Sequence, residues 1–113
     1  MNPITIIAPR FLKAISFVIN IEAITLYPFI ISRAEMKPTT GRHEKIHIAQ
    51  QKELFVLFFY LIYAFDYLKG MFKYRSKTEA YFRIRMEQEA YENQDLEDYL
   101  ENRKRFKWLE YKV

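Results

Sequence analysis

Residues 42–47 read Arg-His-Glu-Lys-Ile-His, and the rest of the chain can be interpreted around this hexapeptide. The spacing of His43 and His47 places both histidines on one face of a helix, one turn apart. From there both imidazoles can reach a single metal ion. Glu44 follows the first histidine, and the chain has only these 2 histidines. The hexapeptide therefore predicts a helix that carries a metal site with an acidic neighbour.

The composition favours one small, regular domain. The chain has 113 residues, of which 50% are hydrophobic and 18% aromatic, and this excludes a disordered polymer. Only 2 glycines and 4 prolines interrupt it, so long regular elements are expected. Because the chain has no cysteine, disulfides and cysteine-rich zinc fingers are excluded, and a reducing cytoplasm is the expected location. The net charge of +4 is spread among interleaved acids, so no nucleic-acid partner is expected.

The N-terminal third predicts a small antiparallel sheet. Residues 4–8 are rich in β-branched side chains, and residues 15–23 alternate between apolar and polar in the period of a half-buried strand. Residues 23–32 again resemble a strand. Pro28 within them cannot donate a ladder hydrogen bond, which indicates an edge strand or a bulge. We expect two or three strands ahead of the histidine-bearing helix.

The first helix is expected over residues 41–68. A polar loop, residues 33–41, leads into it, with Thr39 or Thr40 as the N-cap. Gly70 is the expected stop.

Two further helices are expected after this one. Ser76 and Glu79 form an S-x-x-E capping box that should open a second helix reaching residue 93, and Asp95 is a plausible cap for a third. The predicted fold class is therefore α+β, with a small N-terminal antiparallel sheet followed by three helices.

A third metal ligand is expected on the second helix. A catalytic zinc site usually has three protein ligands, and without cysteine or a third histidine the third ligand must be a carboxylate. Glu87 is the only carboxylate in a stripe that otherwise holds Ala80, Ile84, Ala90 and Tyr91. A buried carboxylate is costly unless a cation compensates it, and a zinc ion would do so. Glu89, in a more polar stripe, remains an alternative.

These motifs resemble those of the gluzincin metallopeptidases, which have a zincin fold. Glu-Gln-Glu-Ala-Tyr, from Glu87 to Tyr91, is similar to the E-x-x-A-D signature that follows HExxH in such enzymes, including very small "minigluzincins". The resemblance implies Glu87 as the ligand. Tyr91 stands where the family often has the aspartate that bonds a ligand histidine, so Tyr91, Glu89 or Asp95 would take over that role. Gln50 matches the glutamine of HExxHxxQ variants, although a solvated helical face explains it equally well.

The function implied by the resemblance is zinc-dependent hydrolysis of peptide bonds. His43, His47 and Glu87 would hold Zn²⁺, and Glu44 would act as the general base. A peptide or protein substrate would add to an edge strand. The candidate edge strand consists of Ala23, Ile24, Thr25, Leu26 and Tyr27. The alternative is a catalytically inactive metal-binding or protein-interaction module on the same scaffold.

The apolar, aromatic run over residues 54–67 is most simply the core helix of a small protein. It is shorter than the roughly 20 residues that a membrane-spanning helix needs, and Asp66 lies inside it. A helix that is apolar on nearly every side leaves two alternatives open, membrane association and a homodimer, and the buried core helix is preferred over both.

Overall fold

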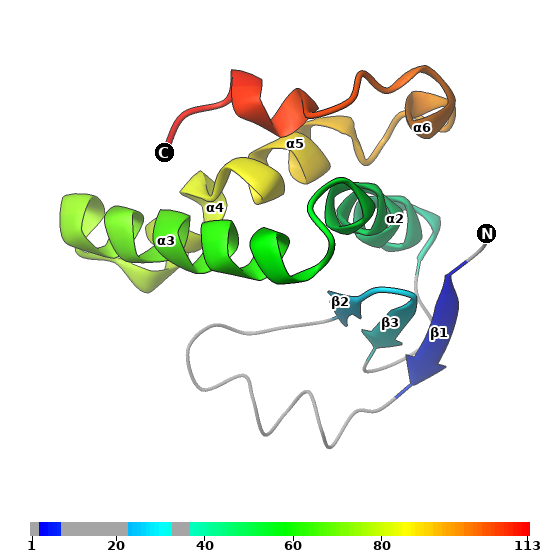
Figure 1. The fold of residues 1–113 in the computed structure, drawn as a ribbon, viewed down its shortest axis with the longest axis horizontal. Helices are drawn as coiled ribbons and strands as arrows, with labels where there is room; N and C mark the ends of the chain where they lie inside the picture. The colour runs from blue at the N-terminus through cyan, green and yellow to red at the C-terminus, as the bar shows by residue number, and fades with distance from the viewer. Residues whose placement is uncertain (1–2, 8–22, 33–36) are drawn as a thin grey trace.

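The computed structural model describes residues 3–7, 23–32 and 37–113, and it confirms the α+β class. Helix α2 lies at the centre, with the sheet on one side of it and α5 and the C-terminal segment on the other (Figure 1). The elements are β1 (Ile4–Ile7), β2 (Ala23–Leu26), β3 (Phe29–Ser32), α2 (Pro38–Glu53), α3 (Leu57–Tyr74), α4 (Lys77–Arg83), α5 (Arg85–Asn93), α6 (Tyr99–Asn102) and the 3₁₀ helix η1 (Lys107–Glu110).

The sheet is mixed, so the prediction of an antiparallel sheet is wrong for one of its two pairings. The strand order is β1-β3-β2, with β2 antiparallel and β1 parallel to β3. The turn at Tyr27–Pro28 joins β2 to β3 and imposes their antiparallel pairing. Residues 8–22 separate β1 from β2 in the sequence, and β1 pairs in parallel with β3. The strand predicted over residues 15–23 lies outside the described residues, apart from Ala23.

The predicted helix over residues 41–68 is two helices. Helix α2 begins at Pro38 after Lys37, without a side-chain cap, so the predicted caps Thr39 and Thr40 lie inside it. Between α2 and α3 the chain bends by 114°. Phe55 and Val56 have φ angles of 54° and 62° there. The bend turns α3 back, so that Phe59 joins a buried cluster with Ile84, Met86 and Trp108.

Gly70 does not end the helix, because α3 continues to Tyr74 and ends at the left-handed residue Arg75. The glycine allows α4 to pack closely instead. A Cβ atom at position 70 would lie 2.9 Å from the Cα atom of Ala80.

The second predicted helix begins as expected, since the Ser76 hydroxyl accepts a hydrogen bond from the backbone N–H of Glu79 at 3.2 Å. It is interrupted at Ile84, which is fully buried and has non-helical φ and ψ angles of −56° and 125°. The new helix α5 begins at Arg85, whose backbone N–H donates to Asp66 at 3.1 Å. The Arg85 guanidinium also contacts both oxygens of this buried carboxylate, each at 2.9 Å.

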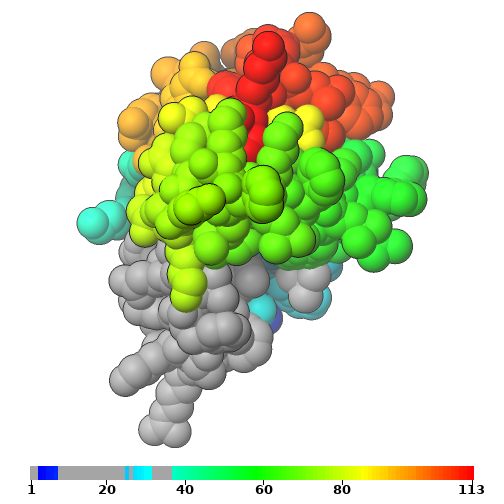
Figure 2. Space-filling view, turned by 90° about the vertical axis from the view of Figure 1, so that its left-hand side faces the viewer, coloured from blue at the N-terminus to red at the C-terminus, as the bar shows by residue number. Residues whose placement is uncertain are grey.

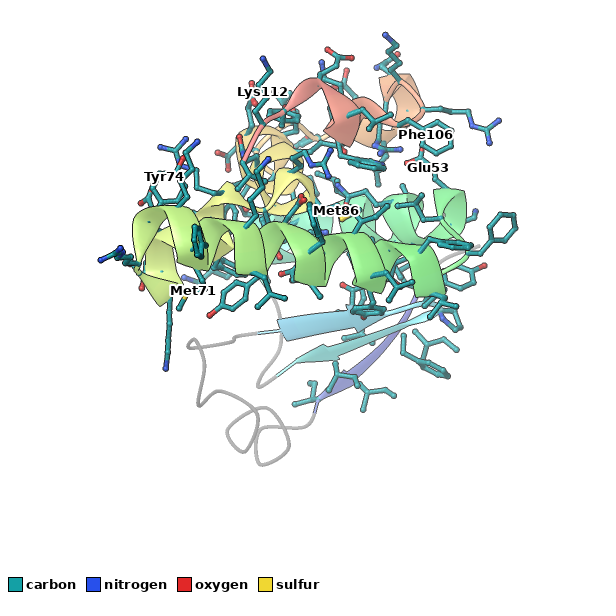
Figure 3. The ribbon with its side chains drawn as sticks, turned by 60° about the vertical axis from the view of Figure 1, so that its left-hand side comes forward. Glu53, Met71, Tyr74, Met86, Phe106 and Lys112 are labelled. Carbon is teal, nitrogen blue, oxygen red and sulfur yellow. The ribbon has the colours of Figure 1, made fainter. Side chains whose placement is uncertain are left out.

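The third predicted helix is largely absent, because only α6 and η1 form after residue 95. Arg103 is extended, and its guanidinium reaches back to Glu89 and Glu53. Phe106 has a φ angle of 57° and donates its backbone N–H to Glu53 (Figure 3). The described part of the chain thus holds five α-helices and one 3₁₀ helix, where three helices were expected.

Among the described residues, no single helix is long and apolar enough to cross a bilayer. Helices α2 and α3 reach that length and apolar composition only when they are counted together, as the bent pair.

Candidate metal centre

Helix α2 presents two polar faces to its neighbours, because its polar residues recur at helical spacing. His43, His47 and Gln50 follow one another at steps of four and three residues and contact α5. Glu44 and Gln51, seven residues apart, contact β2. One helix therefore joins the candidate metal ligands to the edge of the sheet.

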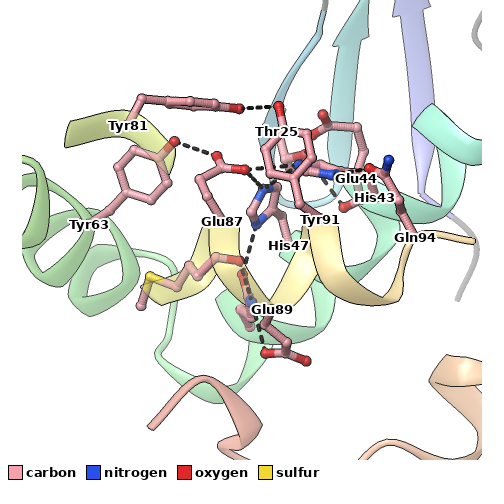
Figure 4. Close-up of polar contacts among 12 residues, drawn as sticks. Thr25, His43, Glu44, His47, Tyr63, Tyr81, Glu87, Glu89, Tyr91 and Gln94 are labelled. Atoms are coloured by element: carbon pink, nitrogen blue, oxygen red, sulfur yellow. Dashed lines mark hydrogen bonds and ion pairs between the residues drawn. The ribbon is translucent and has the colours of Figure 1, made fainter. Parts of the chain in front are cut away.

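His43, His47 and Glu87 converge, as Figure 4 shows. Glu87 Oε1 lies 2.9 Å from His43 Nε2 and 3.0 Å from His47 Nε2, and the two Nε2 atoms are 3.2 Å apart. One ligand atom from each residue lies within 4.8 Å of the others, so the group could hold a metal ion. All three residues are at most 5% exposed. The predicted third ligand, Glu87, is therefore brought to both histidines by the contact of α5 with α2.

Glu87 has its two carboxylate oxygens in different environments. Oε1 faces the histidines, whereas Oε2 accepts a hydrogen bond from the Tyr63 hydroxyl at 2.5 Å. Burial and the charge of Glu87 raise the pKa of Tyr63, so its hydroxyl stays a donor. Oε1 is left to act as a single ligand atom.

The histidines and Glu87 are electrostatically coupled. Burial alone would raise the pKa of Glu87, but the two histidines hold it well below its usual range. Burial alone would lower the pKa of His47, but the charge and hydrogen bond of Glu87, with smaller contributions from Glu44 and Gln50, raise it to about 9. The cluster therefore favours an ionised Glu87 carboxylate next to a positive charge. A divalent cation can take the place of that positive charge.

Each histidine uses its other ring nitrogen to contact an amide oxygen. His47 Nδ1 lies 2.7 Å from Gln50 Oε1, and His43 Nδ1 lies 2.8 Å from Gln94 Oε1. An amide oxygen only accepts, so in each pair the Nδ1 atom carries the proton. Each Nε2 atom then has its lone pair directed at the site when the ring is neutral, as a metal ligand requires.

Glu89, the alternative ligand, lies in a separate ion pair. Its carboxylate is fully buried and contacts Arg103, with Nε–Oε2 and Nη2–Oε1 distances of 2.5 and 3.1 Å. It also accepts hydrogen bonds from Tyr99 and from Gln50 Nε2. Glu89 therefore supports the side chain that orients His47, and it is not part of the ligand group.

Tyr91 packs against the first histidine. Its ring centroid lies 4.3 Å from that of His43, in an edge-on arrangement, and its hydroxyl lies 3.0 Å from that of Tyr81. His43 Nδ1 contacts Gln94 Oε1, a partner that the sequence did not predict. The available signal was its position seven residues after Glu87, two turns along the same helical face.

Glu44 is directed toward the sheet edge. The buried hydroxyl of Thr25, in β2, donates to the Glu44 carboxylate. Gln51 spans the end of this strand, donating to the Thr25 carbonyl at 2.9 Å and accepting from the Tyr27 N–H at 2.6 Å. Tyr60 also donates to the Thr25 carbonyl. The predicted edge strand thus lies beside the predicted base, with its C-terminal end bonded to α2 and α3.

Comparison of the chain with protein-family models, curated proteins and solved structures found no match. The chemistry of the site rests on its donor set. Two imidazole nitrogens and one carboxylate oxygen suit zinc, and three ligands leave a coordination position for a substrate or water.

Proposed function

We propose that this protein is a zinc-dependent peptidase of the gluzincin type. The observation that carries the proposal is the convergence of His43, His47 and Glu87, with Glu44 on the same helix and β2 at the edge of the sheet beside it. Bound by these ligands, zinc would act as a Lewis acid toward a peptide carbonyl and lower the pKa of the attacking water toward about 7.

In this proposal Glu44 acts as the general base. Its carboxylate takes the proton from the attacking water and passes it to the nitrogen of the leaving amine. The Thr25 hydroxyl, which donates to that carboxylate, fixes its orientation. An extended substrate would pair with β2 through main-chain hydrogen bonds. Because Gln51 and Tyr60 already bond the Thr25 carbonyl, substrate pairing is assigned to the N-terminal half of β2.

A second candidate follows from the burial of the cluster. Glu44 is 6% exposed and the ligands no more than 5%. A site so enclosed suits a metal that holds α2 against α5 in a catalytically inactive metal-binding or interaction module. For either candidate, the lack of cysteine fits a cytoplasmic location.

Metal analysis and peptide hydrolysis together test the proposal. Purified protein supplied with zinc should bind about one ion per chain, as one three-ligand site requires, and His43→Ala and Glu87→Ala should lose it. Glu44→Gln should keep the zinc and lose hydrolysis of a peptide mixture, followed by mass spectrometry. Glu97→Gln, an exposed glutamate outside the site, is the matched control and should keep both properties.

The outcomes separate the two candidates. A protein that gains no zinc at micromolar concentration contradicts both of them. Stoichiometric zinc without hydrolysis, and with a large gain in thermal stability on metal loading, supports the inactive module and overturns the peptidase.

A further inference from the structure

Helix α3 carries a continuous apolar surface on its solvent side, which we call the α3 stripe. Its six members are 53–89% exposed, and at 100° per residue they project within an arc of about 100°. They are Leu57, Phe58, Leu61, Phe65, Leu68 and Phe72. Atoms of α3 and the turn after it form a green to yellow-green band across the face shown in Figure 2.

The α3 stripe lies opposite the packed side of the helix. The buried residues of α3 are Phe59, Asp66 and Gly70, which face the core, Arg85 and α4. Because the buried side of α3 already makes the contacts with the core, the stripe is not needed to pack the described residues. Contiguous exposed apolar surface of this kind usually marks an interaction site.

Along the described segment 54–78, which contains the stripe, the exposed charged side chains have one sign. Between residues 54 and 78 the exposed charged side chains are Lys69, Lys73, Arg75 and Lys77, all of them cations. The one acid of this segment, Asp66, is fully buried and paired with Arg85. Lys73 also donates to the Val113 carbonyl at 3.3 Å and remains exposed. The partner of this surface should therefore be apolar and bear negative charge at its rim.

We propose that the α3 stripe docks on an anionic lipid bilayer, with α3 lying in the plane of the membrane surface. Leucine and phenylalanine side chains would enter the boundary between headgroups and acyl chains, as in interfacial amphipathic helices. The lysines would extend their apolar stems along the surface and place their ammonium groups at the phosphates.

A second copy of the chain fits this surface less well than a bilayer does. A two-fold dimer through the stripe would bring together two identical surfaces. Each copy would bring the same four cations, and residues 54–78 would offer no exposed carboxylate to pair with them.

Co-sedimentation with vesicles tests the proposal. The full chain should bind vesicles of phosphatidylcholine mixed with phosphatidylglycerol, bind phosphatidylcholine alone weakly, and lose affinity as salt increases. Leu61→Glu combined with Phe65→Glu should weaken binding more than about tenfold, because two large apolar side chains are removed from the contact. Lys69→Gln combined with Lys77→Gln should reduce only the preference for the anionic vesicles.

The matched control is Leu96→Glu combined with Leu109→Glu, two exposed leucines outside α3, and it should bind like the unmodified chain. Circular dichroism confirms that each variant is folded. Absence of vesicle binding, or an equal loss in the control, overturns the proposal. So does a dimer in sedimentation equilibrium that the Leu61→Glu, Phe65→Glu variant dissociates while vesicle binding is unchanged.

Discussion

Gln50 connects His47 to the C-terminal segment. Its Oε1 atom lies 2.7 Å from His47 Nδ1, while its Nε2 atom donates to Glu89 Oε1 at 2.9 Å and to the Met86 carbonyl at 3.1 Å. The two acceptors fix which end of the amide faces the histidine. Because Arg103 holds Glu89 in turn, the orientation of His47 depends on a residue far along the chain.

Gln50→Leu should weaken zinc binding about 10- to 100-fold, the range typical for loss of a hydrogen bond that orients a ligand histidine. The side chain keeps its approximate volume, but His47 Nδ1 loses its acceptor. A competition titration with a chromophoric chelator measures the affinity. Gln51→Leu is the matched control, since this neighbouring buried glutamine contacts β2 and no ligand. Equal zinc affinities of the two variants would show that Gln50 has no positioning role.

Arg103→Met should destabilise the protein by about 3–5 kcal/mol, because it leaves the buried Glu89 without its cation. Urea unfolding of metal-free protein measures the free energy of unfolding. Arg105→Met removes an exposed arginine two residues away and should change that free energy by less than about 0.5 kcal/mol. Adding Glu89→Gln to Arg103→Met should recover part of the loss. If the two arginine variants unfold at the same urea concentration, the ion pair contributes nothing.

The parts of the fold and site that the sequence predicted depend on local signals. The four-residue spacing of His43 and His47 needs only one helix, and the Ser76 capping box involves neighbours within one turn. Glu87 was favoured because a carboxylate in an apolar stripe needs a compensating group, and the resemblance to the E-x-x-A-D signature decided between it and Glu89. The α+β class followed from β-branched runs ahead of helical periodicity.

The features that the sequence did not predict depend on long-range contacts. No glycine marks the bend at Phe55 and Val56, where positive φ angles oppose the preference of both residues. The burial of Phe59 compensates for the bend. The break at Ile84 is stabilised by Asp66, which lies nineteen residues before Arg85 and accepts a hydrogen bond from its backbone N–H. Helix propensity and hydrophobic periodicity contain no information about such long-range contacts.

Gly70→Ala should destabilise the protein by about 1–3 kcal/mol, because the new methyl group would overlap the backbone of Ala80 at 2.9 Å and force α3 and α4 apart. Gly41→Ala is a matched control within α2, where no atom lies within 4 Å of the added Cβ. It should stabilise the protein by about 0.5–1 kcal/mol through helix propensity. Thermal unfolding of both variants measures the difference. A Gly70→Ala protein as stable as Gly41→Ala would contradict the close packing of α3 and α4.

The charged pair of His47 and Glu87 should make the stability of metal-free protein depend on pH. The pKa of His47 is about 9 in the folded chain and 6.5 in the unfolded reference. The stabilisation of the fold by protonated His47 is therefore complete below pH 6.5 and is lost as the pH rises through 9. That loss is on the order of 3 kcal/mol. The pKa of Glu87 is lowered in the folded chain. The stabilisation of the fold by its ionised carboxylate is therefore lost as the pH falls below the usual pKa of a glutamate.

Urea unfolding in the presence of a chelator, at pH 6 and at pH 9.5, measures the first of these effects. His47→Gln should remove most of the difference between the two values, because the variant has no proton to lose. Zinc should reverse the trend, since the ion competes with the proton for His47 Nε2, and its affinity should rise over the same pH window with release of about one proton. Metal-free protein that is equally stable at both pH values would show that His47 carries no shared proton with Glu87.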